Sequence, residues 1–187
     1  MDFRLLNLIA TVIDFCTPPT EQGRGHPRSA TVRVLATLRQ FLREGTPWRS
    51  LKATADKVSG STLRRHLEQW AGIGVLAQVH AVLVGMLRGD PTLILDNCSV
   101  RAKRGGDLTG PNPTDRGKFG AEPCIHKRGQ PPGSGLGKRR WPVERSNAWV
   151  LENKRLALRY DRLGFIIQSL LQAACIFLVA GRVAKEL

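Results

Sequence analysis

Two carboxylates, Asp96 and Glu144, occupy positions along the chain from which they could take part in chemistry. Asp96 directly follows the apolar residues TLIL at 92–95, and this run predicts a short buried strand over 92–96. A carboxylate at the end of such a strand lies where buried strands present reactive groups. Forty-seven residues, mostly glycine, proline and cations, separate Asp96 from Glu144. The elements around the two residues therefore decide whether they can act together.

The charge of the chain points to a polyanionic partner. Lysine and arginine total 29 against 15 acidic residues, which gives a formal net charge of +14. Nucleic acid is the first candidate partner, and an unselective solvated surface or a ribosomal-type protein is the alternative. The charge is densest between Arg101 and Arg155, where 13 cations face five carboxylates. A basic loop there could follow a phosphate backbone without reading bases, although a merely disordered linker has the same composition.

Length and composition restrict the class of protein. The 187 residues suffice for one domain or two small ones, and 42% apolar residues indicate a globular chain. Four cysteines without CxxC spacing predict no structural zinc site and fit a reduced cytosolic setting. The apolar segment 165–180 is shorter than a typical membrane span, so a buried core helix is the favoured interpretation.

The first 90 residues predict a bundle of helices. Apolar spacing favours helices over 1–16, 29–44 and 72–88, and a further helix starts at 60–62, where Ser61 or Thr62 could cap it. The helix that starts at 60–62 carries Arg64 and Arg65 off its apolar stripe, and a short element precedes it at 48–52. This arrangement is typical of a helix-turn-helix DNA reader, and equally of an amphipathic helix with solvated cations.

Beyond residue 90 the pattern changes. Nine glycines and five prolines lie between Arg101 and Arg140, so regular structure is not expected there. A helix is predicted over 141–160, with Glu144 in its first turn, where the helix dipole alone could explain the carboxylate. The fold class is mainly α with a small β remnant, divided into residues 1–90 and 91–187.

Segments in both halves resemble insertion-sequence transposases of the DDE type, which have an RNase H-like catalytic core. The N-terminal DNA-binding module of that family is similar to residues 47–51, PWRSL, and 61–70, STLRRHLEQW. Its first catalytic strand is similar to residues 95–102, LDNCSVRA. The loop after that strand and the approach to the glutamate helix are similar to GGDLTGPNPTDRGK at 105–118, GQPPGSGLG at 129–137 and RWPVERSNAW at 140–149.

The resemblance implies a metal site. In that family two aspartates and a glutamate hold two divalent metals, Mg²⁺ or Mn²⁺, that activate water or a 3′ hydroxyl for attack on a phosphodiester. Asp96 matches the first aspartate and Glu144 the glutamate, while Arg140 matches an arginine four residues earlier. Gly137 stands where many relatives have a tyrosine. Leu151 stands where they have a lysine, a role that Lys154 or Arg155 nearby could fill.

The second catalytic aspartate is unmatched. The 47 residues between Asp96 and Glu144 contain no apolar run, so the missing strands of an RNase H-like sheet do not fit. An internal deletion that joins the two ends of a longer transposase would explain this. Asp107, Asp115 and Glu122 lie in the gap on segments with no fixed position, which makes any of them a poor replacement ligand. Metal binding by Asp96 and Glu144 alone is then expected to be weak or lost.

The predicted function is DNA transposition by a protein that resembles a DDE transposase and is catalytically incomplete alone. The alternative is a non-enzymatic protein that occupies transposon ends or inhibits the intact enzyme. The expected partner is the double-stranded DNA of the terminal repeats, with oligomers of this chain or with intact transposase, and no membrane. A bacterial cytoplasmic, nucleoid-associated location follows. The residues predicted to contact DNA are Arg49, Lys52, Arg64, Arg65, Arg101, Lys103, Arg104, Lys118, Arg139 and Arg145.

Overall fold

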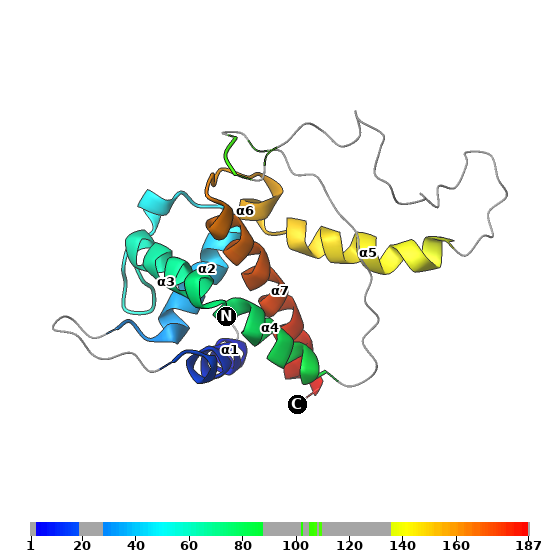
Figure 1. Cartoon of the computed structure of the whole chain (residues 1–187), viewed down its shortest axis with the longest axis horizontal. Helices are drawn as coiled ribbons and strands as arrows, with labels where there is room; N and C mark the ends of the chain where they lie inside the picture. The colour runs from blue at the N-terminus through cyan, green and yellow to red at the C-terminus, as the bar shows by residue number, and fades with distance from the viewer. Residues whose placement is uncertain are drawn as a thin grey trace.

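The computed structural model describes residues 3–18, 28–87, 102, 105–107, 109 and 136–186, with side chains in the last range described from Glu144 onward. The predicted mainly α fold is confirmed (Figure 1). Its elements are α1 (Phe3–Cys16), α2 (Thr31–Glu44), the 3-10 turn η1 (Trp48–Ser50), α3 (Gly60–Ile73), α4 (Val75–Gly85), α5 (Leu136–Leu151), α6 (Lys154–Ala157) and α7 (Gly164–Glu186). Among the described residues, β structure is limited to one isolated parallel bridge between Ala102 and Arg159.

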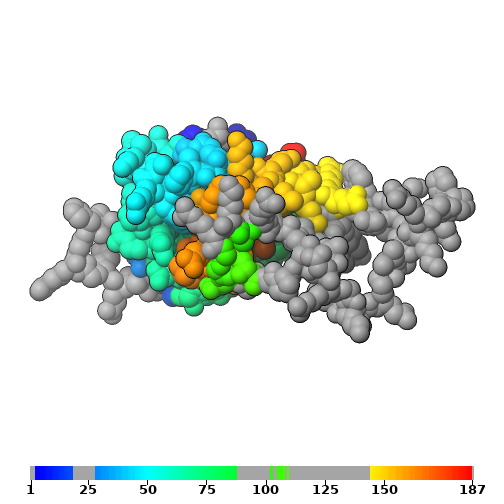
Figure 2. Space-filling view, turned by 90° about the horizontal axis from the view of Figure 1, so that it is seen from above, coloured from blue at the N-terminus to red at the C-terminus, as the bar shows by residue number. Residues whose placement is uncertain are grey.

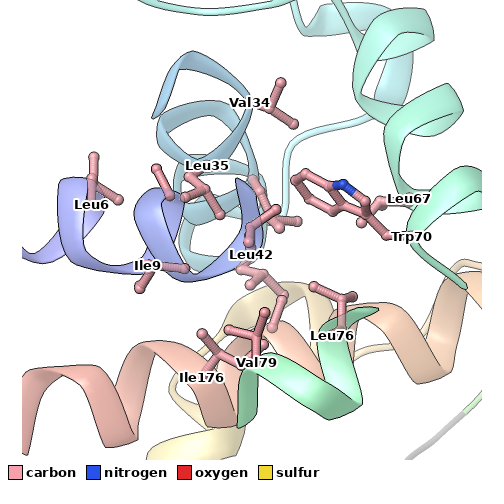
Figure 3. Packing of buried hydrophobic residues seen from close by; sticks show 14 of the residues in the cluster. Leu6, Ile9, Val34, Leu35, Leu42, Leu67, Trp70, Leu76, Val79 and Ile176 are labelled. Atoms are coloured by element: carbon pink, nitrogen blue, oxygen red, sulfur yellow. The ribbon is translucent and has the colours of Figure 1, made fainter. Parts of the chain in front are cut away.

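One hydrophobic core joins the two ends of the chain. The last helix, α7, packs on α4 and also contacts α1 and α3 (Figure 1). Figure 3 shows Ile176 of α7 beside Leu76 and Val79 of α4, below Leu42 of α2. Apolar side chains of five helices, α1, α2, α3, α4 and α7, are buried in the same cluster. Each helix therefore shields the apolar faces of the others from water.

The α2 helix follows its sequence pattern. Its predicted apolar stripe is buried as expected: Val34, Leu35, Leu38, Phe41 and Leu42. Gly45 ends the helix in a left-handed conformation, with φ of 67° and its N–H donating to Phe41 O at 3.1 Å. Glycine adopts this conformation without the steric cost that a Cβ adds.

The α3 helix begins at Gly60, within the predicted range, which is two residues earlier than a cap at Ser61 would allow. The capping side chain is Ser59, whose Oγ accepts from the Thr62 N–H at 3.3 Å, so the prediction of Ser61 or Thr62 as the cap is wrong. Gly60, the first helical residue, lies against Trp48, and a Cβ there would collide with the Trp48 carbonyl oxygen. Only glycine at this position lets α3 start so close to η1. The predicted stripe on α3 is buried: Leu63, Leu67 and Trp70.

The predicted helix 72–88 is shorter in the structure. Gly74, with φ of 66°, ends α3 and starts α4, and the two helices are bent by 74° at this break. Buried residues of α4 are Val75, Leu76, Val79 and Leu83. Val82 and Met86 are each 41% exposed, which corrects the wide apolar face expected from the sequence, because the neighbouring helices cover only one side of α4.

The α5 helix starts at Leu136, earlier than predicted. Residues 136–140 are therefore helical, not loop, and Glu144 lies beyond the first turn, so the prediction that places it there is wrong. Pro142 favoured a start near 141, since proline suits a first helical turn. The predicted helix 141–160 also breaks at 152–153, where the Asn153 side chain donates to Val150 O at 3.0 Å and α6 begins anew.

The α7 helix is longer than the predicted 165–180. By length and composition it could span a membrane, as could the bent pair α3–α4 counted as one broken span, and such helices also occur in soluble cores. Here one side of α7 is buried in the shared core, which agrees with the predicted core helix. The predicted strand 92–96, with Asp96, and most of the predicted loop 101–140 lie outside the described residues.

Candidate nucleic-acid interface

A buried ion pair connects the C-terminal half of the chain to η1. Arg155 Nε donates to Asp161 Oδ2 and Arg155 Nη2 to Asp161 Oδ1, both at 2.8 Å. Trp48 Nε1 donates to the same Asp161 Oδ1 at 2.8 Å, and Arg155 Nη1 donates to Thr46 O at 3.2 Å. Arg155 and Asp161 are 5% and 9% exposed. These hydrogen bonds compensate the burial of two charges, which would be costly without them.

Aromatic rings complete this network. The Arg155 guanidinium lies 4.4 Å from the centroid of the Phe41 ring, and the Phe41 and Trp48 ring centroids are 4.3 Å apart. Arginine favours such stacking because its planar group is weakly hydrated. Arg155 is thus buried and hydrogen-bonded inside the protein, and the role of the unmatched lysine stays a prediction. Lys154, its neighbour, is exposed.

The short segment 105–107 is fastened to the turn before α7. Asp107 N–H donates to Arg162 O at 2.7 Å, and Arg159 Nη2 donates to Asp107 O at 2.9 Å. The Asp107 carboxylate accepts from the Gly164 N–H, the first of α7, at 2.7 Å. A carboxylate at a helix N-terminus satisfies a free N–H and suits the helix dipole. Asp107 therefore caps α7.

A pocket of about 460 Å³ opens where these pieces meet. Trp48 and Arg64 line it from one side, and Gly106 and Asp107 from another. Residues 160–163 and Ile166 complete the wall. Figure 2 shows residues 105–107 and 109, in green, beside the orange residues that precede α7 and next to the N-terminal helices. The pocket thus combines α3 with the C-terminal half of the chain.

Exposed cations surround α3 and η1. Arg49 and Lys52 follow Trp48, and Arg64 and Arg65 lie on α3, all exposed to solvent as predicted. The loop between η1 and α3 is held on α2, because Arg33 Nη2 donates to Thr54 O at 2.6 Å. In addition, the Val58 N–H donates to the buried Thr37 hydroxyl at 2.9 Å. The loop that carries Lys52 is therefore held on α2 by one exposed and one buried hydrogen bond.

His66 on α3 is half-buried and senses this positive charge. Its ring centroid lies 5.6 Å from that of Trp70. Burial lowers the pKa of His66 below its usual 6.5, and the nearby Arg28 and Arg65 lower it further. The imidazole is held neutral because both effects disfavour its charged form. His66 is therefore more than one further residue of a solvated polar face.

Sequence comparison identifies the family. A putative transposase for insertion sequence element IS402 of Burkholderia cepacia is 31% identical over 172 residues, which cover 82% of this chain and 80% of the relative. The chain belongs to the insertion-sequence transposases. An uncharacterized 16.2 kDa protein of the same insertion element is 28% identical over 118 residues, 60% of this chain and 80% of that protein. No family model matches the chain, and no solved structure matches it.

The transposase family resemblance is thereby confirmed, while the predicted catalytic residues stay untested. Glu144 is exposed on α5, Arg140 lies on α5 with only its backbone described, and Asp96 is outside the described residues. Convergence of Asp96 and Glu144 is therefore a prediction. Within the part of the chain that the structure describes, no three His, Cys, Asp or Glu side chains form a group able to hold a metal ion.

Of the remaining residues predicted to contact DNA, some lie among the described residues and some do not. Arg145 is exposed and lies 4.4 Å from the centroid of the Trp149 ring, which Arg182 of α7 also approaches, at 5.3 Å. Arg139 is on α5 with its side chain undescribed. The other predicted contacts lie outside the described residues: Arg101, Lys103, Arg104 and Lys118.

Sequence reasoning missed the residues that assemble the pocket. Trp48 and Asp161 are 113 positions apart, and periodicity carries no information about such a pair. Asp107 was considered only as a replacement metal ligand. The run RYDR at 159–162, directly before an apolar helix, was the available signal, since a charged cluster at a helix start often makes capping and tertiary contacts.

Proposed function

We propose that this chain acts in DNA transposition as a DDE-type protein that binds double-stranded DNA at transposon terminal repeats. The observation that carries the proposal is the 31% identity to a named transposase along most of both chains. The exposed Arg64 and Arg65 on α3 support it, because they lie off the buried stripe and are open to solvent, where they could contact phosphates. Arg49 and Lys52 extend this face from η1. A helix-turn-helix mode of binding is part of the proposal.

Catalysis by this chain alone is proposed to be incomplete. Asp96, Glu144 and Arg140 would supply part of an RNase H-like site for Mg²⁺ or Mn²⁺, whose role is to activate the attacking oxygen. Two described carboxylates support the proposal of an incomplete site, because Glu144 is solvent-exposed on α5 and Asp107 accepts from the first N–H of α7. Asp115 and Glu122 remain candidate replacements for the second aspartate.

A non-enzymatic role is the second candidate. The short span between Asp96 and Glu144, with no apolar run for further strands, favours it. Such a protein would occupy transposon ends and, through oligomers with itself or with intact transposase, limit the intact enzyme. We propose that an internal deletion in a longer ancestral transposase shortened the segment between Asp96 and Glu144. The matched IS402 transposase is itself not much longer than this chain, since 80% of it aligns over 172 residues.

We propose a bacterial cytoplasmic location in association with the nucleoid. The high positive charge favours retention on DNA. Packing of one side of α7 in the shared core supports a protein that does not use this helix to cross a membrane.

One experiment separates binding from catalysis. Purified protein is incubated with labelled duplex that carries the terminal repeats, with Mg²⁺ or Mn²⁺, and binding and nicking are scored separately. We expect binding that weakens steeply with salt, because phosphate contacts release counterions, and no nicking. Nicking that Asp96→Ala and Glu144→Gln abolish would overturn the incomplete site. Binding that stays constant as salt rises would overturn the phosphate contacts.

A further inference from the structure

We propose that the pocket between α3 and residues 160–163 binds a phosphate group of DNA between Arg64 and Arg162. The inference rests on the proposed DNA binding and deepens it, because it adds a contact from the C-terminal half of the chain. Arg64 and Arg162 come from positions 98 residues apart in sequence and line the same concave surface. The DNA site is then a joint product of both halves of the chain.

The two guanidinium groups are available for a ligand. Arg64 and Arg162 are exposed, and neither side chain has a hydrogen bond or ion pair with any residue that the structure describes. Other arginines nearby already form hydrogen bonds within the protein. Arg155 is paired with Asp161, Arg159 donates to Asp107 O, and Arg33 donates to Thr54 O. Among the described residues, the pocket therefore presents two unpaired positive groups beside arginines that are already paired.

The backbone around Arg162 is held in place from two directions. Arg162 O accepts from the Asp107 N–H, and a Cβ at Gly106 would lie 2.6 Å from both the Cα and the O of Arg162. Gly106 also has φ of 110°, a conformation that side chains rarely permit. On the other side, Asp161 is fixed by Arg155 and Trp48. A cation on a rigid backbone loses less entropy when it binds an anion.

Two carboxylates also line the pocket, and their charges are partly compensated. Asp161 is buried in its ion pair with Arg155. Asp107 uses one oxygen to accept from the Gly164 N–H, at the positive end of α7. The pocket therefore keeps a net positive charge from Arg64 and Arg162. Asp107, which is exposed, is the residue that opposes anion binding.

The test measures the affinity of the full chain for a labelled duplex by fluorescence anisotropy at several salt concentrations. Arg162→Ala is compared with Arg43→Ala, an exposed arginine at the end of α2 that does not line the pocket. We expect Arg162→Ala to weaken binding roughly tenfold and to lower the salt slope by about one, as the loss of one phosphate contact does. The control should change affinity less than about twofold, and Arg162→Lys should recover part of the loss, because lysine keeps the charge.

A second variant is expected to strengthen DNA binding, which partial unfolding of the variant could not explain. Asp107→Asn keeps an oxygen able to accept from the Gly164 N–H and removes a negative charge, so we expect tighter DNA binding and only a small fall in melting temperature, from the lost charge–dipole interaction. Inorganic phosphate serves as a competitor to distinguish the backbone of DNA from a free anion. We expect millimolar phosphate to displace DNA no more than chloride of equal ionic strength does.

The outcomes separate this inference from the proposed function. Equal affinities of Arg162→Ala and Arg43→Ala, with wild-type binding intact, would overturn the phosphate site and leave the proposed DNA binding standing. Phosphate that binds wild type but not Arg162→Ala, while Arg162→Ala keeps the wild-type affinity for DNA, would assign the pocket to a free anion and overturn the DNA contact. A wild-type protein that binds no duplex would overturn both.

Discussion

At the scale of single residues, arginines of this chain have two different roles, and one of them, Arg155, is buried. Arg155 stands in the most basic stretch of the sequence, yet it is buried against Phe41 and paired with Asp161. Arg64 and Arg162, by contrast, stay exposed. Net charge alone does not distinguish these roles, because a cation near a carboxylate and an aromatic ring becomes a structural group.

The first prediction concerns this ion pair. Arg155→Met leaves the Asp161 carboxylate buried with Trp48 as its remaining described side-chain donor, and we expect a loss of about 3–5 kcal/mol in the free energy of unfolding. The double variant Arg155→Met with Asp161→Asn should lose less than the sum of the two single variants, because no uncompensated charge remains. Urea unfolding followed by circular dichroism measures both, with Arg43→Met as an exposed control expected to stay within about 0.5 kcal/mol. Additive losses would contradict the pairing.

A second prediction at this scale concerns pH. The pKa of His66 is lowered in the folded protein by burial and by Arg28 and Arg65. As pH falls through about 6.5, the unfolded chain takes up a proton at this residue before the folded protein does, so folding becomes less favourable. Stability is therefore full above pH 6.5 and decreases toward acid. Melting temperatures at pH 7.5 and 5.5 should fall further for wild type than for His66→Gln, and equal falls would contradict the shift.

At the scale of elements, periodicity was the reliable signal and helix ends were not. Leu63, Leu67 and Trp70 were correctly placed in the core because burial of a helix face repeats every three to four residues. The start of α3 falls within the predicted range 60–62, but its cap was misplaced, because Ser59, Ser61 and Thr62 can all cap and the contact of Gly60 with Trp48 favours the first. The start of α5 was misplaced because Pro142 is tolerated inside that helix.

Exposed residues of the candidate site could be predicted from the sequence, and its pocket could not. Arg64 and Arg65 were predicted to be exposed because they fall off a helical stripe, which is local information. The pocket depends on Trp48, Gly106 and Arg162, which are distant in sequence. Only tertiary packing brings them together, and a single sequence without relatives gives no record of such pairs.

The cap of α3 gives a third prediction. Ser59→Ala removes the side-chain oxygen that accepts from the Thr62 N–H, and we expect a loss of about 1 kcal/mol in unfolding free energy. Ser61→Ala is the matched control, since this exposed residue contacts Ser59 Oγ but no backbone N–H, and a change within about 0.5 kcal/mol is expected. Chemical denaturation of both variants measures the difference. A larger loss for Ser61→Ala would restore the cap predicted from sequence.

At the scale of the whole molecule, the division into residues 1–90 and 91–187 remains a prediction, and the packing of α7 bears on its meaning. The α7 helix contacts α1, α3 and α4, and its buried residues belong to the same cluster as theirs (Figure 3). Two regions separated in sequence therefore share one core. The N-terminal helices are then expected to depend for stability on the C-terminal end of the chain.

The final prediction tests this dependence. A fragment of residues 1–90 exposes the apolar faces of α1, α3 and α4 that α7 covers, and we expect it to unfold without a cooperative transition and to associate through those faces. Within the full chain, Leu170→Ala on the buried side of α7 should cost about 2–5 kcal/mol. Leu171→Ala, which is 45% exposed, should cost less than about 1 kcal/mol. A fragment that melts as sharply and at the same temperature as the full chain would instead show that α7 is dispensable, and the N-terminal helices would then be an independent domain.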